Sequence, residues 1–208
     1  VIERGQKVAL VGKNGEGKST MIKAIMGEID FDGKLEVGHN AQIGYFAQNQ
    51  ASLLDEDATI FETIDHIAVG DIRTQIKNIL GAFMFHGDDI QKKVKFLSGG
   101  EKTRLAMIKL LLEPVNLLIL DEPMSGLDPL ARAQVKDIML EQRKSGRTVF
   151  LSSHILSDLE ELCDRVAVLH GGRIMFIGKP KDVLSQTGQV GLERAFLSLT
   201  GLQNNEAA

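Results

Sequence analysis

The segment from residue 12 to residue 20 has the composition of a loop that binds phosphate. It is GKNGEGKST and matches the pattern G-x-x-x-x-G-K-[ST], whose glycines let backbone N–H groups approach phosphate oxygens closely. Lys18 would reach the β- and γ-phosphates of a nucleotide, and the Ser19 hydroxyl would bind Mg²⁺. The residues of this loop predicted to bind the nucleotide are Gly12, Asn14, Gly15, Gly17, Lys18, Ser19 and Thr20.

Two adjacent acids offer a second kind of chemistry. Asp121 and Glu122 follow four aliphatic residues, so we expect them at the carboxyl end of a buried strand, where open α/β sheets bind ligands. Carboxylates at such a place are costly unless they serve a cation or a proton transfer. Asp121 is therefore predicted to hold Mg²⁺ together with Ser19, and Glu122 to activate a water molecule as general base.

A third segment predicts another anion site. Ser98, Gly99 and Gly100 precede a helix predicted from residue 101 to residue 112. A serine hydroxyl and unobstructed backbone N–H groups at a helix N-terminus favour a bound anion.

The elements needed to position these residues alternate along the chain. Apolar runs predict strands over 7–11, 33–37, 42–46, 117–120, 148–152 and 165–169. Helices are predicted over 18–26, 129–144, 155–162, 181–186 and 192–199, and apolar residues at helical spacing predict an inserted helical subdomain over about 52–97. This alternation is typical of a parallel sheet covered by helices on both faces.

Composition limits the possible functions. The net charge of −4 gives no support to a role based on overall basicity, and specific DNA binding is not expected. The single cysteine, Cys163, excludes an internal disulfide, and its apolar surroundings favour a buried structural residue over a catalytic thiol. No apolar run approaches the ~20 residues needed to span a bilayer, so membrane spans would have to come from another chain.

Together, the phosphate-loop pattern, LSGGE at 97–101, LLILDEP at 117–123 and the segment Ser125–Asp128 resemble the ATP-binding cassette (ABC) family. The resemblance covers nearly the whole chain and implies one nucleotide-binding domain over residues 1–208. The implied fold is the α/β P-loop NTPase fold, with a mainly parallel sheet, short antiparallel strands near the N-terminus and the inserted helical subdomain. The implied cofactors are ATP and Mg²⁺, and the implied activity is ATP hydrolysis.

The resemblance also gives roles to residues that composition alone would not select. Gln48 resembles the family glutamine that contacts Mg²⁺ or the attacking water, with Gln50 as a nearby competitor. His154 matches the histidine that touches the γ-phosphate, and Asp128 would lie at a domain interface. The remaining histidines lack such a context, and surface or core roles are expected for them: His39, His66, His86 and His170.

In this family the segment Ser98–Gly100 acts on the ATP held by a second domain. The resemblance therefore implies a head-to-tail homodimer, or pairing with another ABC domain, around two ATP molecules. Family members also stack adenine on an aromatic residue upstream of the phosphate loop. No aromatic residue occurs between Val1 and Gly12, so we expect weak discrimination between ATP and GTP.

The resemblance divides by branch. Residues 1–120 resemble the ABC-F group of ribosome-associated proteins, through IGYFAQ at 43–48 and KFLSGGEKTRLA at 95–106. Residues 124–208 resemble the ATP-binding subunit of an exporter, through SGLDP at 125–129 and SSHILSDLEE at 152–161.

Three hypotheses follow from this division. The favoured one is a transporter's ATP-binding subunit, cytoplasmic or peripheral at the inner face of the cell membrane, with membrane-spanning permease partners. The second is a fragment of a soluble ABC-F-like translation factor that acts on the ribosome. The third is a chimera of the two, whether natural, designed or an assembly artefact.

Overall fold

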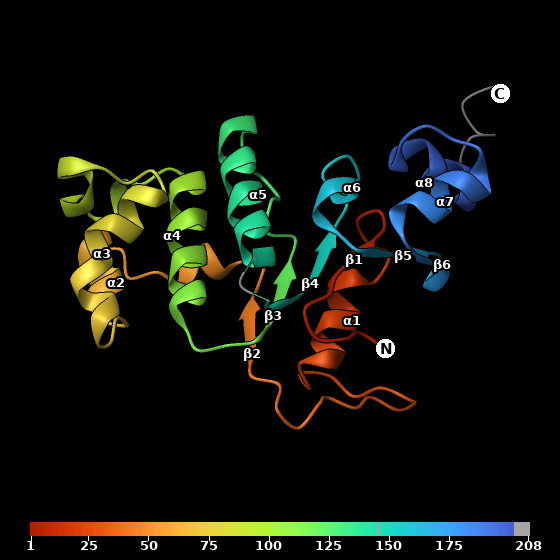
Figure 1. Ribbon diagram of the computed structural model, residues 1–208, viewed down its shortest axis with the longest axis horizontal. Helices are drawn as coiled ribbons and strands as arrows, with labels where there is room; N and C mark the ends of the chain where they lie inside the picture. Colours follow the sequence, from red (N-terminus) through yellow and green to blue (C-terminus); the bar gives the residue numbers. More distant parts are fainter. Residues whose placement is uncertain (145, 202–208) are drawn as a thin grey trace.

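The computed structural model describes residues 1–144 and 146–201 of the chain (Figure 1). In this part, six strands form one sheet in the order β2-β3-β4-β1-β5-β6. Every neighbouring pair is parallel except β5 and β6, which are antiparallel. The strands are β1 (Lys7–Val11), β2 (Ile43–Phe46), β3 (Leu117–Asp121), β4 (Thr148–Ser153), β5 (Arg165–His170) and β6 (Arg173–Gly178).

Helices connect and flank these strands. The α-helices are α1 (Lys18–Ile25), α2 (Ile60–Asp65), α3 (Asp71–Ala82), α4 (Gly99–Leu112), α5 (Pro129–Lys144), α6 (Leu159–Leu162), α7 (Pro180–Thr187) and α8 (Leu192–Thr200). The described residues also form three short 3₁₀ helices, η1 (Gln50–Leu53), η2 (Gly87–Gln91) and η3 (Val94–Phe96). None of the helices in the described ranges combines the length and the apolarity that a bilayer crossing requires.

Alternate residues of the strands face two separate apolar layers, as the pleat of a sheet requires. Val8 and Leu10 of β1 point to a layer with Ile22 of α1, whereas Ala9 and Val11 point to the larger layer on the other face. That larger layer joins buried residues of α4, α5 and α8 to the sheet. The sheet is thus covered on both faces, and almost continuously apolar strands follow from that double burial.

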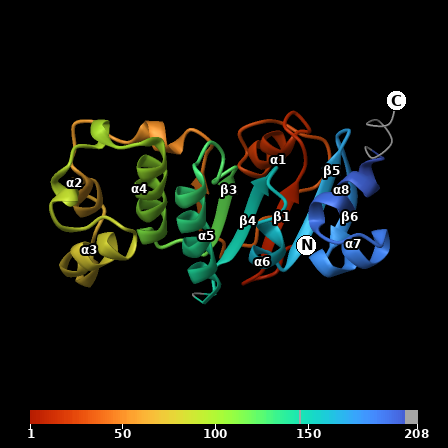
Figure 2. The same ribbon diagram turned by 90° about the horizontal axis from the view of Figure 1, so that it is seen from above.

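The molecule is elongated, and its two ends differ. Helices α2 and α3 lie at one end beyond α4, and α7 and α8 lie at the other end beside β5 and β6 (Figures 1 and 2). The helix α2 begins with a capping box, in which Thr59 accepts from the Glu62 N–H and Glu62 accepts from the Thr59 N–H. The sheet with its phosphate loop lies between these two helical ends.

The predictions for the N-terminal strands were partly wrong. Residues 33–37 are exposed and form no strand, because no other segment of the described chain pairs with them and an isolated extended segment has no ladder to join. The antiparallel pairing is instead that of β5 with β6, and β6 itself was not predicted. Its sequence contains the apolar run IMFI at 174–177, but its side chains are mostly exposed, unlike those of the other strands.

Two further expectations can be compared with the structure. The helix predicted over 155–162 begins only at Leu159, because the Ser153 hydroxyl accepts from the Ile155 N–H and holds a turn there. Cys163 is buried, and this burial raises the pKa of its thiol to about 12, as befits a structural residue.

Candidate active site

The phosphate-loop residues lie between β1, which ends at Val11, and α1, which begins at Lys18. Gly15 and Gly17 have φ angles of 85° and 98°, a left-handed conformation that glycine adopts without strain. Gly12 is required for a different reason: a Cβ there would lie 2.7 Å from the carbonyl oxygen of Leu169 in β5. The loop thus owes its shape to backbone conformation at two positions and to close packing at a third.

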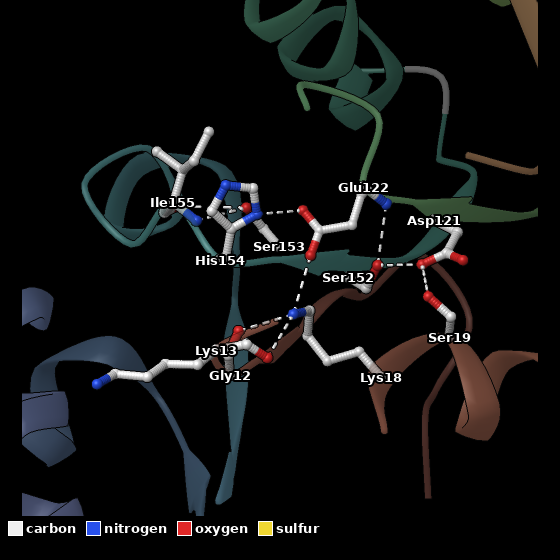
Figure 3. Close-up of polar contacts among 10 residues, drawn as sticks. All are labelled: Gly12, Lys13, Lys18, Ser19, Asp121, Glu122, Ser152, Ser153, His154 and Ile155. Carbon is white, nitrogen blue, oxygen red and sulfur yellow. Dashed lines mark hydrogen bonds and ion pairs between the residues drawn. The ribbon is translucent and has the colours of Figure 1, made fainter. Parts of the chain in front are cut away.

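The Lys18 ammonium is almost fully buried at the base of this loop. Its Nζ donates hydrogen bonds to the carbonyl oxygens of Gly12 (2.7 Å) and Lys13 (3.0 Å), and lies 3.0 Å from Glu122 Oε1 (Figure 3). A buried cation is stable only with such compensating partners. The loop therefore places a positive charge and the N-terminus of α1 together, which is the cradle that phosphate requires.

Asp121 comes from the carboxyl end of β3 and meets two hydroxyl groups. Ser19 Oγ donates to Asp121 Oδ1 over 3.1 Å, and Ser152 Oγ donates to the same oxygen over 2.6 Å. Ser152 also accepts from the Glu122 N–H at 2.9 Å, so one hydroxyl fixes both acids (Figure 3). Sequence reasoning missed Ser152, although its pairing with Asp121 follows directly from the β3–β4 register.

Glu122 joins the phosphate loop to His154. Its Oε2 lies 2.7 Å from His154 Nδ1, while its Oε1 faces the Lys18 ammonium. Its backbone has a φ of 49°, which is unusual for a residue other than glycine and is stabilised here by the Ser152 hydrogen bond. A carboxylate held between a lysine and a histidine, beside a second acid, can accept a proton from a water molecule.

A magnesium ion would have few protein ligands here. Ser19 and Asp121 offer two oxygen atoms within hydrogen-bonding distance of each other, and no cluster of three His, Cys, Asp or Glu residues suited to a metal occurs in residues 1–144 and 146–201. This donor set fits Mg²⁺, because Mg²⁺ binds proteins through one or two side chains and completes its shell with water and substrate phosphates.

Other residues predicted for the site form no hydrogen bond with this cluster in the described part of the chain. Gln48 lies in the turn after β2, at the same sheet edge as Asp121, and its exposed side chain forms no hydrogen bond in the described chain. The exposed side chains of Asn14 and Thr20 likewise form none. Asp128 caps α5, because its Oδ1 accepts from the N–H groups of Leu130 (2.9 Å) and Ala131 (3.0 Å).

The segment Ser98–Gly100 forms the N-terminus of α4. Ser98 accepts from the Glu101 N–H at 3.3 Å, and Glu101 accepts from the Ser98 N–H at 2.7 Å. Burial opposes ionisation of Glu101, but the Ser98 hydrogen bonds outweigh it and lower the pKa of this carboxyl. Ser98 and Gly99 remain exposed, whereas a Cβ on Gly100 would lie 2.8 Å from the Ala131 Cβ of α5.

A cavity of about 410 Å³ opens beside the phosphate loop and reaches the C-terminal helix α8. Its lining residues come from three regions of the chain, namely Gly12, Lys13, Asn14, His154, Leu156, Glu193, Phe196 and Leu197. His154 therefore borders both this space and the Glu122 carboxylate. The phosphate loop and the predicted γ-phosphate histidine thus share one solvent-accessible opening.

The fold and this site define an α/β nucleotide-binding domain with a phosphate loop, and comparisons with known proteins specify it further. The sequence model of the ABC transporter family matches residues 1–125. The chain belongs to this family and is an ABC ATPase domain.

Relatives of two kinds match the sequence. ABC transporter F family member 2 of Arabidopsis thaliana is 41% identical over 176 residues, which cover 84% of this chain and 26% of the relative. The probable ATP-binding protein YbiT of Escherichia coli O157:H7 is 35% identical, over 90% of this chain and 36% of its own length. An uncharacterised ABC transporter ATP-binding protein of Synechocystis, sll0415, is 32% identical over 88% of this chain and 56% of its own.

Solved structures agree with the fold. The ATP-binding subunit of an ABC transporter superposes with a TM-score of 0.80 at 28% identity, over 96% of this chain and 90% of that one. The cbiO1 protein of Clostridium perfringens, described as part of the transporter complex cbiONQ, gives a TM-score of 0.71 over 89% and 81% at 28% identity.

The lengths of these matches can be compared with the prediction that residues 1–120 and 124–208 resemble different branches of the family. The chain spans about a quarter of the length of the ABC-F relatives from Arabidopsis. The ABC-F match of 176 residues exceeds the 120 residues expected to resemble that group, so the similarity continues into the second half of the chain.

Proposed function

We propose that this chain binds ATP with Mg²⁺ at the phosphate loop and hydrolyses it to ADP and phosphate. The single observation that carries the proposal is the series of contacts Lys18–Glu122–His154, in which Lys18 and Glu122 are buried, beside the Asp121–Ser19 pair. Such a cluster has a cation for the phosphates, a carboxylate for proton transfer and oxygen ligands for a metal ion. Structural packing alone would not require two adjacent acids here.

Each residue then has one task in the reaction. Lys18 and the N–H groups of the loop hold the phosphates, and Ser19 with Asp121 would hold Mg²⁺. Glu122 accepts the proton of the attacking water, while His154 orients that carboxylate and faces the phosphate side of the cavity. Mg²⁺, when bound, would offset the negative charge that develops on the transferred phosphoryl group.

The variant Glu122→Gln tests this assignment most sharply. It keeps the size of the side chain but removes the base, so we expect hydrolysis to fall about 10²–10⁴-fold while ATP binding persists. Phosphate release and binding of a fluorescent ATP analogue measure the two quantities separately. Glu113→Gln, the same change at an exposed residue whose side chain forms no hydrogen bond in the described chain, serves as the control. Normal hydrolysis by Glu122→Gln would rule out Glu122 as the base.

The partner chains proposed here are a second ABC domain and the permease subunits of a transporter. The transporter subunit of known structure covers nearly the full length of this chain and is itself covered to 90%, which supports this choice. The protein would then work at the inner face of the cell membrane, with its spans supplied by the permease. The segment Ser98–Gly100 would contact the nucleotide held by the second domain.

A second candidate is a ribosome-associated protein of the ABC-F kind. The identities of 41% and 40% to ABC transporter F family members favour it. Cosedimentation with purified ribosomes, using the Glu122→Gln chain with ATP, distinguishes the two candidates. Stoichiometric, ATP-dependent sedimentation would favour the ABC-F function, and its absence together with ATPase stimulation by a reconstituted permease would favour transport.

A further inference from the structure

The phosphate loop is held from outside by the turn between β5 and β6. Glu16, within the loop, has its Oε1 2.9 Å from His170 Nδ1, and its Oε2 accepts from the Gly171 N–H at 2.6 Å. These partners are about 150 residues away in sequence, so only the fold brings them together. The phosphate-binding pattern and the family resemblance gave Glu16 no role, and only a surface or core role was expected for His170.

The conformation of the turn aims these donors at the loop. Gly171 and Gly172 have φ angles of 55° and 70°, so both central residues are left-handed, as in the tight turns that join antiparallel strands. The β5–β6 register is also irregular between Val168 and Leu169, directly before the turn. The irregularity and the two glycines together fix where His170 and the Gly171 N–H point.

The same end of β5 contacts the loop a second time. Gly12, where the loop begins, lies so close to the Leu169 carbonyl that a Cβ would come within 2.7 Å of it. Glu16 anchors the loop near its other end, one residue before Gly17. The segment 12–16 is therefore attached to β5 and its turn at both ends, which limits the conformations that its N–H groups can adopt.

The direction of the Glu16 pKa shift agrees with the geometry of this contact. Burial opposes its ionisation, but hydrogen bonds from His170 and Gly171 outweigh burial and hold the pKa of this carboxyl below its usual value. The side chain is therefore an anion next to a loop that is expected to bind anions. Direct contact between this anion and a bound phosphate would be repulsive, whereas its contacts with His170 and the Gly171 N–H restrict the conformation of the loop.

We propose that Glu16 is a positioning residue: it holds the phosphate loop on the β5–β6 turn, through His170 and the Gly171 N–H, and so sets the affinity for the nucleotide phosphates. This inference rests on the proposed binding of ATP at the loop. Glu16 does not touch the reacting atoms, and its effect passes through the N–H groups of residues 13–17. A preordered loop binds more tightly because less conformational entropy is lost on binding.

The test compares Glu16→Ala, Glu16→Gln and His170→Ala in binding and hydrolysis. Glu16→Ala removes both contacts, and we expect the Kd and KM for MgATP to rise about tenfold, or ~1.4 kcal/mol, with kcat changed less than twofold. Glu16→Gln retains an oxygen acceptor for the Gly171 N–H and should restore most of the affinity. Combined with Glu16→Ala, His170→Ala should add almost nothing, because the two residues act as one unit.

Controls separate this inference from the proposed function and from unfolding. Glu113→Ala removes an exposed carboxylate and should leave Kd and KM unchanged, and circular dichroism confirms that each variant is folded. Hydrogen exchange of the Gly171 amide, measured without nucleotide, should accelerate in Glu16→Ala. If the wild-type chain does not bind MgATP, the proposed function fails, whereas the exchange result still tests the contact. Wild-type affinity, or tighter binding, in folded Glu16→Ala would overturn the positioning role.

Discussion

The two helix N-termini predicted to bind phosphate, those of α1 and α4, are built in opposite ways. At α1, Lys18 is buried and joined to Glu122 and His154 through an unbroken set of polar contacts. At α4, Ser98 and Gly99 are exposed, and the Ser98 hydroxyl is engaged only with its own helix. None of the hydrogen bonds or ion pairs found in residues 1–144 and 146–201 joins the two.

The difference between the two sites lies in how many of their polar groups find partners within one copy of the chain. Buried charges need partners inside the chain, so the α1 site is nearly complete within one copy. An exposed helix end with unobstructed N–H groups costs little in water and is available to a ligand held elsewhere. The comparison fits a division of labour in which one copy binds the nucleotide and a second copy completes the site.

The largest effect is expected from removing the buried cation. Lys18→Ala should weaken ATP binding by at least about 100-fold, because it removes the phosphate partner and leaves Glu122 buried without its counterion. Titration of a fluorescent ATP analogue measures the loss. Lys23→Ala, at an exposed position on the same helix, should bind normally; equal affinity of Lys18→Ala and wild type would show that the α1 site is not the nucleotide site.

At the α4 site the expected effect is smaller and steric. In Gly100→Ala the added methyl would meet Ala131 at 2.8 Å, which should destabilise the chain by ~1–3 kcal/mol. Thermal unfolding without nucleotide measures this cost. Gly99→Ala has open space and should unfold near the wild-type temperature, while Ala131→Gly should rescue Gly100→Ala. Equal stability of the two glycine variants would mean that Gly100 has no packing role in its own chain.

The smallest effect is expected from removing the Ser152 hydroxyl, which hydrogen-bonds to Asp121 and to the Glu122 N–H. Ser152→Ala removes the hydrogen bonds to Asp121 Oδ1 and from the Glu122 N–H, at a cost of ~1–2 kcal/mol in unfolding free energy. ATP hydrolysis should fall more than ATP affinity does, because Glu122 is misplaced while the phosphate loop is intact. Chemical denaturation and phosphate release check both parts, with Ser157→Ala, on an exposed residue, as the control. A wild-type rate of hydrolysis by Ser152→Ala would show that Ser152 is not required to place Glu122.

Sequence alone predicted the parts of the site that depend on short-range pattern. The strand over 7–11, the loop after it and the start of α1 at Lys18 are as predicted, because glycines and apolar runs act locally. The phosphate loop was likewise placed correctly at the carboxyl end of its strand. This follows from the strand–loop–helix order and needs no knowledge of distant contacts.

The sequence alone could not predict contacts that depend on strand register or on segments distant in the chain. Ser152 meets Asp121 only because β3 and β4 pair in one particular register, and His170 meets Glu16 only because β5 ends beside the loop. The segment 33–37 has the composition of a strand, but a strand also needs a neighbour to pair with. The side chain of Gln48 is exposed and forms no hydrogen bond to either acid in the described residues, so its predicted role stays a prediction.

We propose that a complete hydrolytic site contains the phosphate loop of one copy and the α4 N-terminus of another. The most direct test is the specific ATPase activity of the purified chain as a function of its concentration, with the oligomeric state measured at each point by analytical ultracentrifugation. If a second copy completes the site, activity per molecule should rise with concentration and follow the fraction of dimer. Constant activity per molecule down to a demonstrably monomeric solution would contradict it.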